Sequence, residues 1–308
     1  MKIIFFGSSE FAIPALNELV QNDYEILVVV TQPDKPIGRD RILSPTPLAV
    51  FASARGIEIL KPETLKDEFF FDKFKALSPD LCVVAAYGKI IPKKYLEIPK
   101  YGFVNIHPSL LPKYRGPSPI QTAIMNGETE TGVTIMLVDA EMDHGPIIAV
   151  KKHQIPSGAY FPEIHDELAK LGAKLMIKAL RKYISGAYKP QEQDHSQATV
   201  TKMLARKDGR VNWQMPADKI YNQIQALNPE PGTWTTWNGK ILNIKKANHL
   251  KHNLSDEKGT VKRFENDIAV ACDGSILILE IIQLAGKKEM TAKDFLNGHS
   301  DFLGSRLN

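Results

Sequence analysis

Three side chains in the first half of the sequence could act together: Asn105 and His107 could donate hydrogen bonds to a developing negative charge, and Asp143 could support His107. Asn105 and His107 are two residues apart, and in an extended segment such residues point to the same side. The carboxamide donates a hydrogen bond in any protonation state, and the imidazole donates from whichever nitrogen carries a proton. A carboxylate near His107 favours its charged form, and Asp143 is the candidate. This combination suits attack on a carbonyl carbon whose oxygen becomes an anion.

Three other chemistries fit the sequence less well. A zinc hydrolase could use His107, Asp143 and His144, but adjacent residues point apart in an extended chain and no H-E-x-x-H spacing is present. Ser109 lacks the G-x-S-x-G context of a serine nucleophile. The turn at Gly7 lacks the second and third glycines of a dinucleotide motif. We therefore expect neither a metal nor a nicotinamide cofactor.

Composition indicates a soluble protein of two domains. The chain has 308 residues, 43% of them hydrophobic and 24% charged, which is typical of globular proteins but long for a single core. Cys82 and Cys272 form no Cys-x-x-Cys pair, so a disulfide framework is not indicated. No apolar run reaches the roughly 20 residues that cross a bilayer. The net charge of +4 permits a polyanionic partner without requiring one. We expect a monomeric, cytoplasmic protein.

The first half has the alternating pattern of a Rossmann-like α/β fold. Apolar runs predict strands at 2–6, 25–30, 57–60, 80–86, 102–104 and 131–138, and helical spacing predicts helices at 10–21, 46–54 and 65–77. Strands that are apolar throughout indicate a mostly parallel sheet with helices on both faces. Ligands of such sheets bind beyond the carboxyl ends of the strands. Gly7, Gly88 and the segments at 105 and 143 all follow predicted strand ends, so one cleft can collect them.

The second half changes pattern after a long predicted helix at 163–183. Residues 189–208 have few large apolar side chains and no clear period, which predicts a linker. A helix at 221–227 is followed by short strands with turn signals at Asn238-Gly239 and Asp273-Gly274. Regularly spaced short strands indicate a small barrel. We expect a catalytic domain at 1–188, a linker at 189–207 and a β-barrel domain at 208–308.

Several segments resemble those of the folate-dependent formyltransferases. They are residues 6–16, 31–39, 86–92, 131–136 and 143–146, the block 105–120 with its His-Pro-Ser-Leu-Leu-Pro run, and 228–234 and 285–290 in the second half. The resemblance covers nearly the whole chain. It implies a formyltransferase whose C-terminal domain is an OB-like barrel that holds tRNA. The implied substrates are 10-formyltetrahydrofolate, as the formyl donor, and the α-amine of methionyl initiator tRNA, formylated for translation initiation.

The resemblance also implies roles for individual residues. It gives catalytic roles to Asn105, His107 and Asp143. On the folate side it implies Ser109, Leu110, Leu111, Pro112, Tyr87, Gly88, Ile90, Met142 and Gly145. Arg39 matches a loop arginine that contacts the acceptor end of the tRNA. Other basic residues in that loop or beside the expected domain boundary are further candidates for tRNA binding: Lys35, Arg41, Lys202, Arg206 and Lys207.

Formyl transfer to an amine needs no covalent enzyme intermediate. A free α-amine titrates near pH 8, at about 7.7 to 8.0, so losing its proton is a modest cost at neutral pH. The difficult step is stabilising the oxyanion, a role that suits Asn105 and His107. By resemblance, Asp143 also orients a water and relays the amine proton.

Three functions remain open from the sequence. The first is the tRNA reaction. The second is transfer to a small acceptor such as a glycinamide ribotide or an amino sugar, or hydrolysis of the folate. The third is a nonenzymatic RNA-binding protein. The three catalytic candidates count against the third function. The Arg39 loop and the barrel-like tail count against the second.

Overall fold

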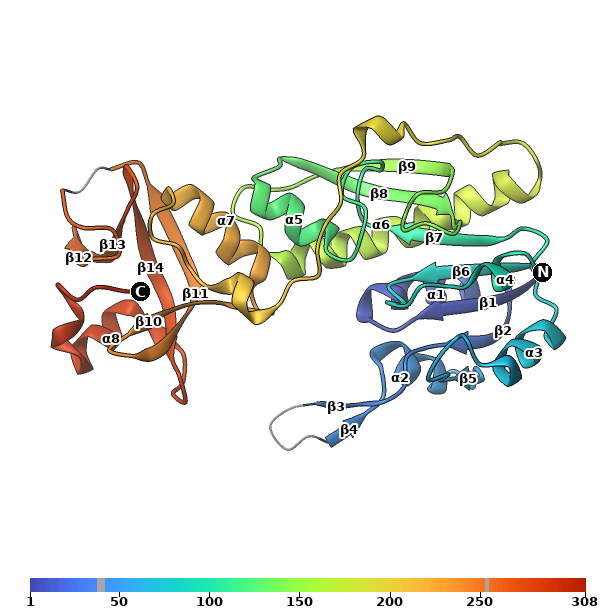
Figure 1. Cartoon of the computed structure of the whole chain (residues 1–308), viewed down its shortest axis with the longest axis horizontal. Coiled ribbons are helices and arrows are strands. Elements are labelled where there is room, and N and C mark those ends of the chain that lie inside the picture. The colour runs from blue at the N-terminus through green and yellow to red at the C-terminus, as the bar shows by residue number, and fades with distance from the viewer. Residues whose placement is uncertain (38–41, 253–254) are drawn as a thin grey trace. The chain divides into compact units, whose positions relative to one another are not determined.

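The computed structural model describes residues 1–37, 42–252 and 255–308, and the chain forms two compact units (Figure 1). The first unit comprises Met1–Pro119, Glu130–Gln154 and Ile164–Thr201. The second comprises Ile120–Thr129, Ile155–Glu163 and Lys202–Asn308. Of the expected linker, residues 189–201 therefore group with the first unit and 202–207 with the second. No helix in the described ranges combines the length and apolarity that crossing a membrane requires.

A mixed sheet forms the centre of the first unit. Within the described residues it has seven strands in the order β5-β2-β1-β6-β7-β8-β9. They are β1 (Lys2–Gly7), β2 (Glu25–Val30), β5 (Ile59–Leu60), β6 (Leu81–Ala85), β7 (Phe103–His107), β8 (Glu130–Leu137) and β9 (Ile147–Gln154). Neighbours from β5 to β7 are parallel, whereas β8 pairs antiparallel with both β7 and β9. The predicted Rossmann-like, mostly parallel sheet is confirmed.

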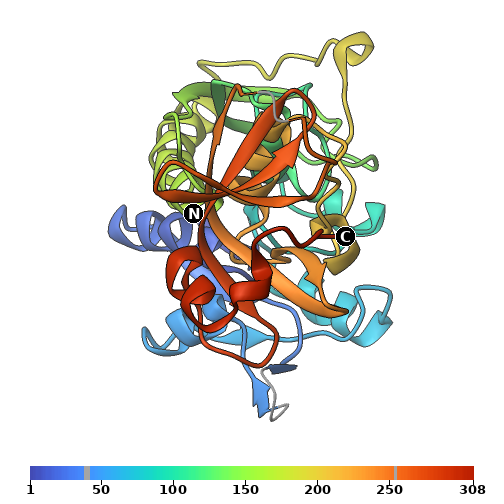
Figure 2. The same ribbon diagram turned by 90° about the vertical axis from the view of Figure 1, so that its left-hand side faces the viewer.

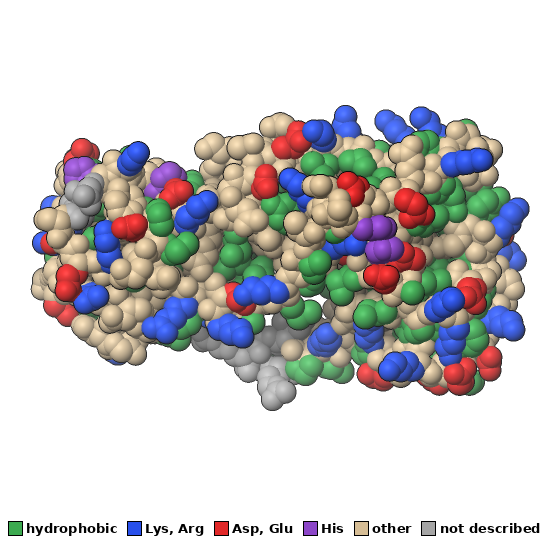
Figure 3. All heavy atoms as spheres, turned by 45° about the horizontal axis from the view of Figure 1, so that its top comes forward, with side chains coloured by type: hydrophobic (Ala, Val, Ile, Leu, Met, Phe, Trp, Pro, Cys, Tyr) green, Lys and Arg blue, Asp and Glu red, His purple; other side chains and the backbone are tan. Residues whose placement is uncertain are grey.

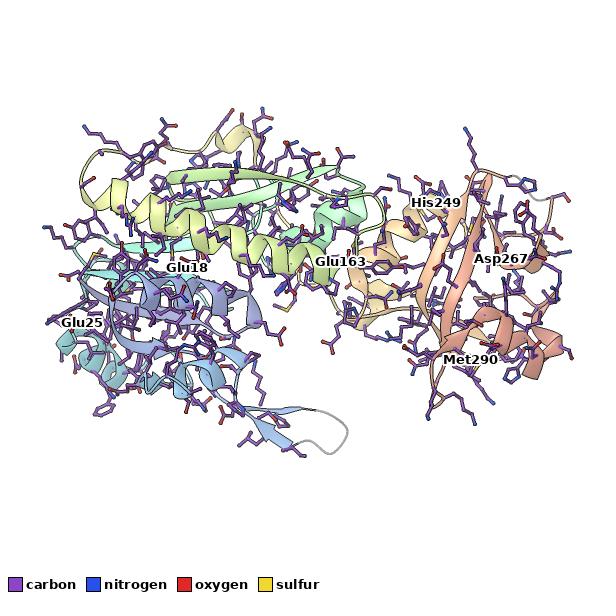
Figure 4. All side chains as sticks on the ribbon, turned by 180° about the vertical axis from the view of Figure 1, so that it is seen from behind. Glu18, Glu25, Glu163, His249, Asp267 and Met290 are labelled. Carbon is purple, nitrogen blue, oxygen red and sulfur yellow. The ribbon has the colours of Figure 1, made fainter. Side chains whose placement is uncertain are left out.

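Helices cover both faces of this sheet, as expected. The helices in this part of the chain are η1 (Glu10–Ala12), α1 (Ile13–Gln21), α2 (Pro47–Ser53), α3 (Glu68–Ala76), α4 (Lys93–Leu96), α6 (Phe161–Ile184) and η2 (His195–Gln197). On one face, Phe6 of β1 and Phe103 of β7 pack with Phe74 of α3. On the other, α6 runs along the sheet (Figure 4) and approaches it so closely that a Cβ on Gly172 would lie 2.7 Å from Cγ2 of Ile106.

That alternation fixes where the polar side chains of β7 point. Ile106 faces α6, and neighbouring residues of a strand point to opposite sides. Asn105 and His107 therefore face away from α6. The structure places both residues inside β7, whereas the sequence predicted a strand that ends at residue 104. The extended geometry assumed for the pair is present.

Several elements were not predicted. They are the hairpin of β3 (Lys35–Ile37) and β4 (Ile42–Ser44), together with α4, α5 (Pro119–Asn126), β9, and α8 (Ala292–Gly298). β9 has a physical reason for being missed: it is an edge strand, and its Val150, Lys151 and Lys152 are all exposed. The sequence therefore lacks the continuous apolar run of a buried strand.

The second unit is an antiparallel β domain. Its described strands are β10 (Thr233–Trp237), β11 (Lys240–Leu250), β12 (Val261–Phe264), β13 (Asp267–Cys272), β14 (Ser275–Leu284) and β15 (Met290–Thr291). They pair in the order β10-β11-β14-β13-β12, with β15 on β14. Figure 2 presents these strands in orange to red. The predicted C-terminal β domain is confirmed.

Aromatic rings and helices close the core of this domain. The Trp237 ring meets Phe295 and Phe302 edge-on, with centroids 5.3 and 5.5 Å away. Phe295 lies in α8, and α7 (Ala217–Leu227) contributes Ile220 and Ile224 to the same buried cluster. The remaining short helices are η3 (Arg206–Gly209) and η4 (Ser300–Phe302).

Candidate active site

The three candidate catalytic side chains meet in the first unit. Asn105 Nδ2 donates to Oδ1 of Asp143 over 3.3 Å, and His107 Nδ1 lies 3.5 Å from the same oxygen. β7 supplies the first two residues. The third lies in the loop 138–146 between β8 and β9. β8 pairs with β7 on one side and with β9 on the other. Thirty-eight residues of sequence separate Asn105 from Asp143, and the antiparallel turn of β8 brings them together.

The orientation of the His107 ring follows from its hydrogen bonds. Nε2 lies 3.0 Å from the carbonyl oxygen of Tyr114, which can only accept, so Nε2 carries a proton. The ring is only 4% exposed. Nδ1 therefore faces Asp143, and it can donate there only when the ring is charged. A neutral ring would present a lone pair at that nitrogen.

The Asp143 carboxylate is held from two sides. Oδ2 accepts the backbone N–H of Gly116 over 2.8 Å, while Oδ1 faces Asn105 and His107. Asn105 has a second amide hydrogen that this contact leaves available. The site thus combines a fixed carboxylate with two potential donors.

The loop after β7 is held by its own polar groups. Ser109 Oγ donates to the carbonyl of Lys113 over 2.6 Å, and Thr134 Oγ1 donates to the carbonyl of Ser109 over 2.7 Å. Thr134 Oγ1 also accepts the N–H of Leu111. Ser109 and Leu111 are buried, whereas Leu110 and Pro112 are half-buried. Of these four folate candidates, the last two are the more accessible to a ligand.

The other folate candidates differ in what they present. The Tyr87 ring is buried edge-on against Phe6 with centroids 5.3 Å apart, and burial raises the pKa of its phenol. The whole residue is 2% exposed, and its carbonyl accepts a hydrogen bond from Gln32 Nε2 over 2.8 Å. Gly88 is exposed, and Ile90 and Met142 are 76% and 55% exposed, which offers apolar surface. Gly145 is buried, and a Cβ there would lie 2.2 Å from the carbonyl oxygen of Leu137.

His144 points to partners outside the three catalytic candidates. Its Nδ1 lies 2.7 Å from Oδ2 of Asp139, and its ring stacks on that of His195 with centroids 4.0 Å apart. It was expected to be a neighbour of the chemistry rather than a participant, and this geometry gives it such a place.

The candidate tRNA contacts fall in both units. Arg39 and Arg41 lie outside the described residues. Lys35 begins β3 and donates to Oε1 of Gln32 over 2.6 Å. On the face that Figure 3 presents, Lys and Arg side chains are interspersed with Asp and Glu. Individual contacts therefore have to identify the basic residues that are available to a polyanion.

Lys202, Arg206 and Lys207 belong to the second unit, and two of them are engaged. Lys202 pairs with Asp208, and this hydrogen bond lowers the pKa of the Asp208 carboxyl. Arg206 donates to the carbonyl of Pro231 over 2.8 Å and to Oδ1 of Asn243, and burial lowers the pKa of its guanidinium. Lys207 is exposed.

Sequence reasoning missed the segment that holds the site together. Residues 191–201, here called the strap, were predicted as linker. Gln191 exchanges backbone hydrogen bonds with Ile147, and Arg115 does so with Thr199 and Thr201. The strap therefore contacts the loop that follows β7 and the start of β9, which follows the loop that carries Asp143. The only advance signal was the Arg115-Gly116 pair at the end of the His-Pro-Ser-Leu-Leu-Pro block.

Comparison with known proteins agrees with this architecture. Residues 1–180 match the formyl transferase family, and residues 203–300 match the formyl transferase C-terminal domain. A methionyl-tRNA formyltransferase of Chloroflexus aurantiacus is 44% identical, over 98% of both chains. One from Caldanaerobacter subterraneus is 39% identical, over 97% of both chains.

A solved structure shows the same fold at lower identity. It is an N-formyltransferase from Helicobacter canadensis, in complex with folinic acid and dTDP-3-aminofucose. It aligns with a TM-score of 0.69 at 20% identity, over 91% of this chain and 98% of that chain. The chain is 44% and 39% identical to these two relatives over nearly the full length of each, and both domains match. It therefore belongs to the methionyl-tRNA formyltransferase family.

Proposed function

We propose that this chain transfers the formyl group of 10-formyltetrahydrofolate to the α-amine of methionyl initiator tRNA through the joint action of Asn105, His107 and Asp143. The observation that supports this assignment most directly is their convergence, with Oδ1 of Asp143 at 3.3 Å from Asn105 Nδ2 and 3.5 Å from His107 Nδ1. The curated relatives, which align over nearly their full length, carry the name of this reaction.

The surroundings of the site suit a flat, partly apolar co-substrate. Ile90 and Met142 expose most of their apolar surface, and Leu110 is half-buried. All three lie on segments that follow the ends of β6, β7 and β8. These side chains would hold the folate ring system, which supplies an activated formyl group when bound. The buried Ser109 hydroxyl would act indirectly, by fixing the loop that carries Leu110.

Asn105 and His107 would stabilise the charge that develops on the formyl oxygen. Asn105 has an amide hydrogen left for this purpose, and the charged form of His107 has a donor at Nδ1. Removing one oxyanion donor typically costs about 100- to 1,000-fold in rate. Because His107 Nε2 is hydrogen-bonded to the Tyr114 carbonyl, the ring cannot present Nε2 to the substrate without breaking that bond.

Asp143 would receive the proton of the attacking amine, directly or through one water. Its carboxylate accepts hydrogen bonds from Gly116 and Asn105, so it stays in place while a proton moves. Nitrogen then gains the formyl carbon and loses a proton, and N10 of the folate departs with a proton. Electrons and protons balance without an oxidant or a metal.

The second unit would hold the tRNA, as we propose for residues 208–308 together with the Arg39 loop of the first unit. Lys207 is an exposed basic residue and would contact a phosphate. Arg206 and Lys202 would act mainly through the protein contacts described above. We also propose that the enzyme works as a monomer in the cytoplasm, where translation is initiated.

One experiment tests the function. The purified chain is incubated with 10-formyltetrahydrofolate and, in parallel, with methionyl initiator tRNA, methionyl elongator tRNA, or small amines such as an amino sugar nucleotide. The proposal expects rapid formylation of the initiator only. Formylation of a small amine with no reaction on either tRNA would refute it. Folate hydrolysis without any acceptor would refute it as well.

A further inference from the structure

The strap carries a buried carboxamide that the reaction scheme above does not use. Gln193 is 5% exposed, and its Nε2 donates to the backbone carbonyls of Asp143, over 2.9 Å, and Gly145, over 2.8 Å. Both hydrogens of one amide group are therefore spent on the loop that carries the catalytic carboxylate. A single carboxamide nitrogen thus bridges two carbonyls that lie on either side of His144.

Arg115 fixes which way this carboxamide points. Its Nε and Nη2 donate to Gln193 Oε1 over 3.2 and 2.7 Å. A guanidinium has no acceptor, so the oxygen of the carboxamide must face Arg115 and the nitrogen must face the loop. Arg115 is itself 8% exposed, which screens the pair from water. The orientation of the Gln193 carboxamide is thus set by its hydrogen bonds to Arg115.

The loop after β7, which pairs with the strap, also holds the side chain of Asp143. Gly116, next to Arg115, donates its N–H to Oδ2 of Asp143. The backbone of Arg115 is paired in turn with Thr199 and Thr201 of the strap. Asp143 is therefore gripped at its backbone by Gln193 and at its carboxylate by Gly116.

The loop needs such support because its backbone is unfavourable. Asp143 has a φ of 50°, a left-handed conformation that is uncommon for non-glycine residues. Conformations of this kind persist where surrounding contacts enforce them. The two hydrogen bonds from Gln193 act directly on this residue and on Gly145.

We propose that Gln193 is a positioning residue for Asp143: its carboxamide, oriented by Arg115, holds the 143–145 loop so that the carboxylate reaches Asn105 and His107. This inference rests on the proposed formyl transfer and adds to it a residue that touches no substrate. Gln193 acts through the loop backbone, so its loss should change turnover much more than substrate affinity.

Two substitutions separate the possible roles of the side chain. Gln193→Glu keeps an acceptor for Arg115 but loses both donors to the loop. Gln193→Met keeps the length and loses donors and acceptor alike. We expect each to lower kcat by about 10- to 100-fold, the range for a small displacement of a catalytic group. KM for the folate and for the tRNA should stay within about 2-fold. Gln191→Glu, the same chemical change at an exposed side chain of the strap, is the control and should keep wild-type kcat.

A double-mutant cycle with Asp143→Asn identifies the route of the effect. If Gln193 acts through Asp143, Gln193→Glu should add less than about 2-fold in the Asp143→Asn background. A full additional loss there would overturn the inference, because it would show a general structural role. Wild-type kcat in both Gln193→Glu and Gln193→Met would overturn it too. Thermal unfolding and tetrahydrofolate binding report whether each variant is folded.

The remaining outcomes are also decisive. If one variant does not fold, the other gives the answer. If neither folds, the inference is rejected, because the fold itself then requires the residue. Failure of the wild-type enzyme in the acceptor assay would instead refute the proposed function. An active wild type with unaffected Gln193 variants refutes only the positioning role.

Discussion

Gly116 donates its backbone N–H to Oδ2 of Asp143 over 2.8 Å, joining the loop after β7 to the loop after β8. Gly116 has a φ of 102°, and a Cβ there would lie 2.8 Å from the carbonyl oxygen of Thr201. The close packing of the strap against residue 116 therefore requires a glycine. Through this one contact the strap, the first loop and the carboxylate are fixed together.

Replacing Asp143 with Asn should nearly abolish turnover while leaving folate binding largely intact. The amide keeps the size of the side chain but cannot accept the amine proton, and proton transfer of this kind is worth about 100- to 10,000-fold. Single-turnover formylation of the initiator tRNA measures the effect, and tetrahydrofolate binding checks the site. Asp72→Asn on the exposed side of α3 is the matched control. Wild-type kcat in Asp143→Asn would exclude the proposed role.

Replacing Gly172 with Ala should destabilise the first unit. Its new methyl group would lie 2.7 Å from Cγ2 of Ile106 and 3.1 Å from Cγ1 of Val133, and overpacking of a core typically costs about 1 to 3 kcal/mol. Chemical denaturation gives the change in unfolding free energy. Gly298→Ala, at the end of α8 with nothing within 4 Å, should be neutral or slightly stabilising. Equal effects at the two sites would contradict the packing described for α6.

Arg206 and Lys207 are adjacent basic residues for which we predict opposite behaviour. Arg206→Ala should lower the stability of the second unit by about 1 to 2 kcal/mol, because the Pro231 carbonyl and Asn243 Oδ1 lose their charged donor. Lys207→Ala should leave stability unchanged within about 0.5 kcal/mol. If Lys207 contacts a phosphate, its loss should make tRNA affinity less dependent on salt, with the slope reduced by about one. Unfolding curves and a salt titration of tRNA binding separate the two effects.

Both thiols should be inert in the folded enzyme. Burial raises the pKa of the Cys82 thiol, and it raises the pKa of the Cys272 thiol to about 12. The folded state thus favours the protonated thiols, and their contribution to stability is present below the ordinary pKa of about 8.5. It is lost as the pH rises above that value, because the unfolded chain ionises first. Titration with a thiol reagent at pH 8 should detect both cysteines only after denaturation. Rapid reaction of one equivalent with the native enzyme would contradict the prediction.

The sequence predicted the elements whose signal is local. β2 has the predicted bounds of 25–30, because a buried parallel strand is apolar at every position. Asn105 and His107 could be paired from their spacing alone, since extended geometry makes i and i+2 neighbours. Asp143 was the candidate carboxylate for His107 and was supported by resemblance, but its approach to them depends on the β8 pairing with β7.

Gln193 could not be predicted in this way. The strap has no hydrophobic period, and its contacts are hydrogen bonds and the stacking of His195 on His144, none of which leaves a local pattern in composition. Tyr87 was expected on the folate side by resemblance, and its ring packs into the aromatic core around Phe6. The direction of a side chain after a strand end depends on the turn, and Ala86 there has a φ of 46°.

The position of Gln193 also bears on when the enzyme becomes competent as it is made. A ribosome that has released only the first 184 residues, through the end of α6, has synthesised Asn105, His107 and Asp143 but not the Gln193 amide that holds the loop of Asp143. N-terminal regions fold first during synthesis, so the nascent chain would hold its chemical groups before it could align them. An enzyme that serves the start of translation would thus reach its full activity only once elongation of its own polypeptide has passed the strap.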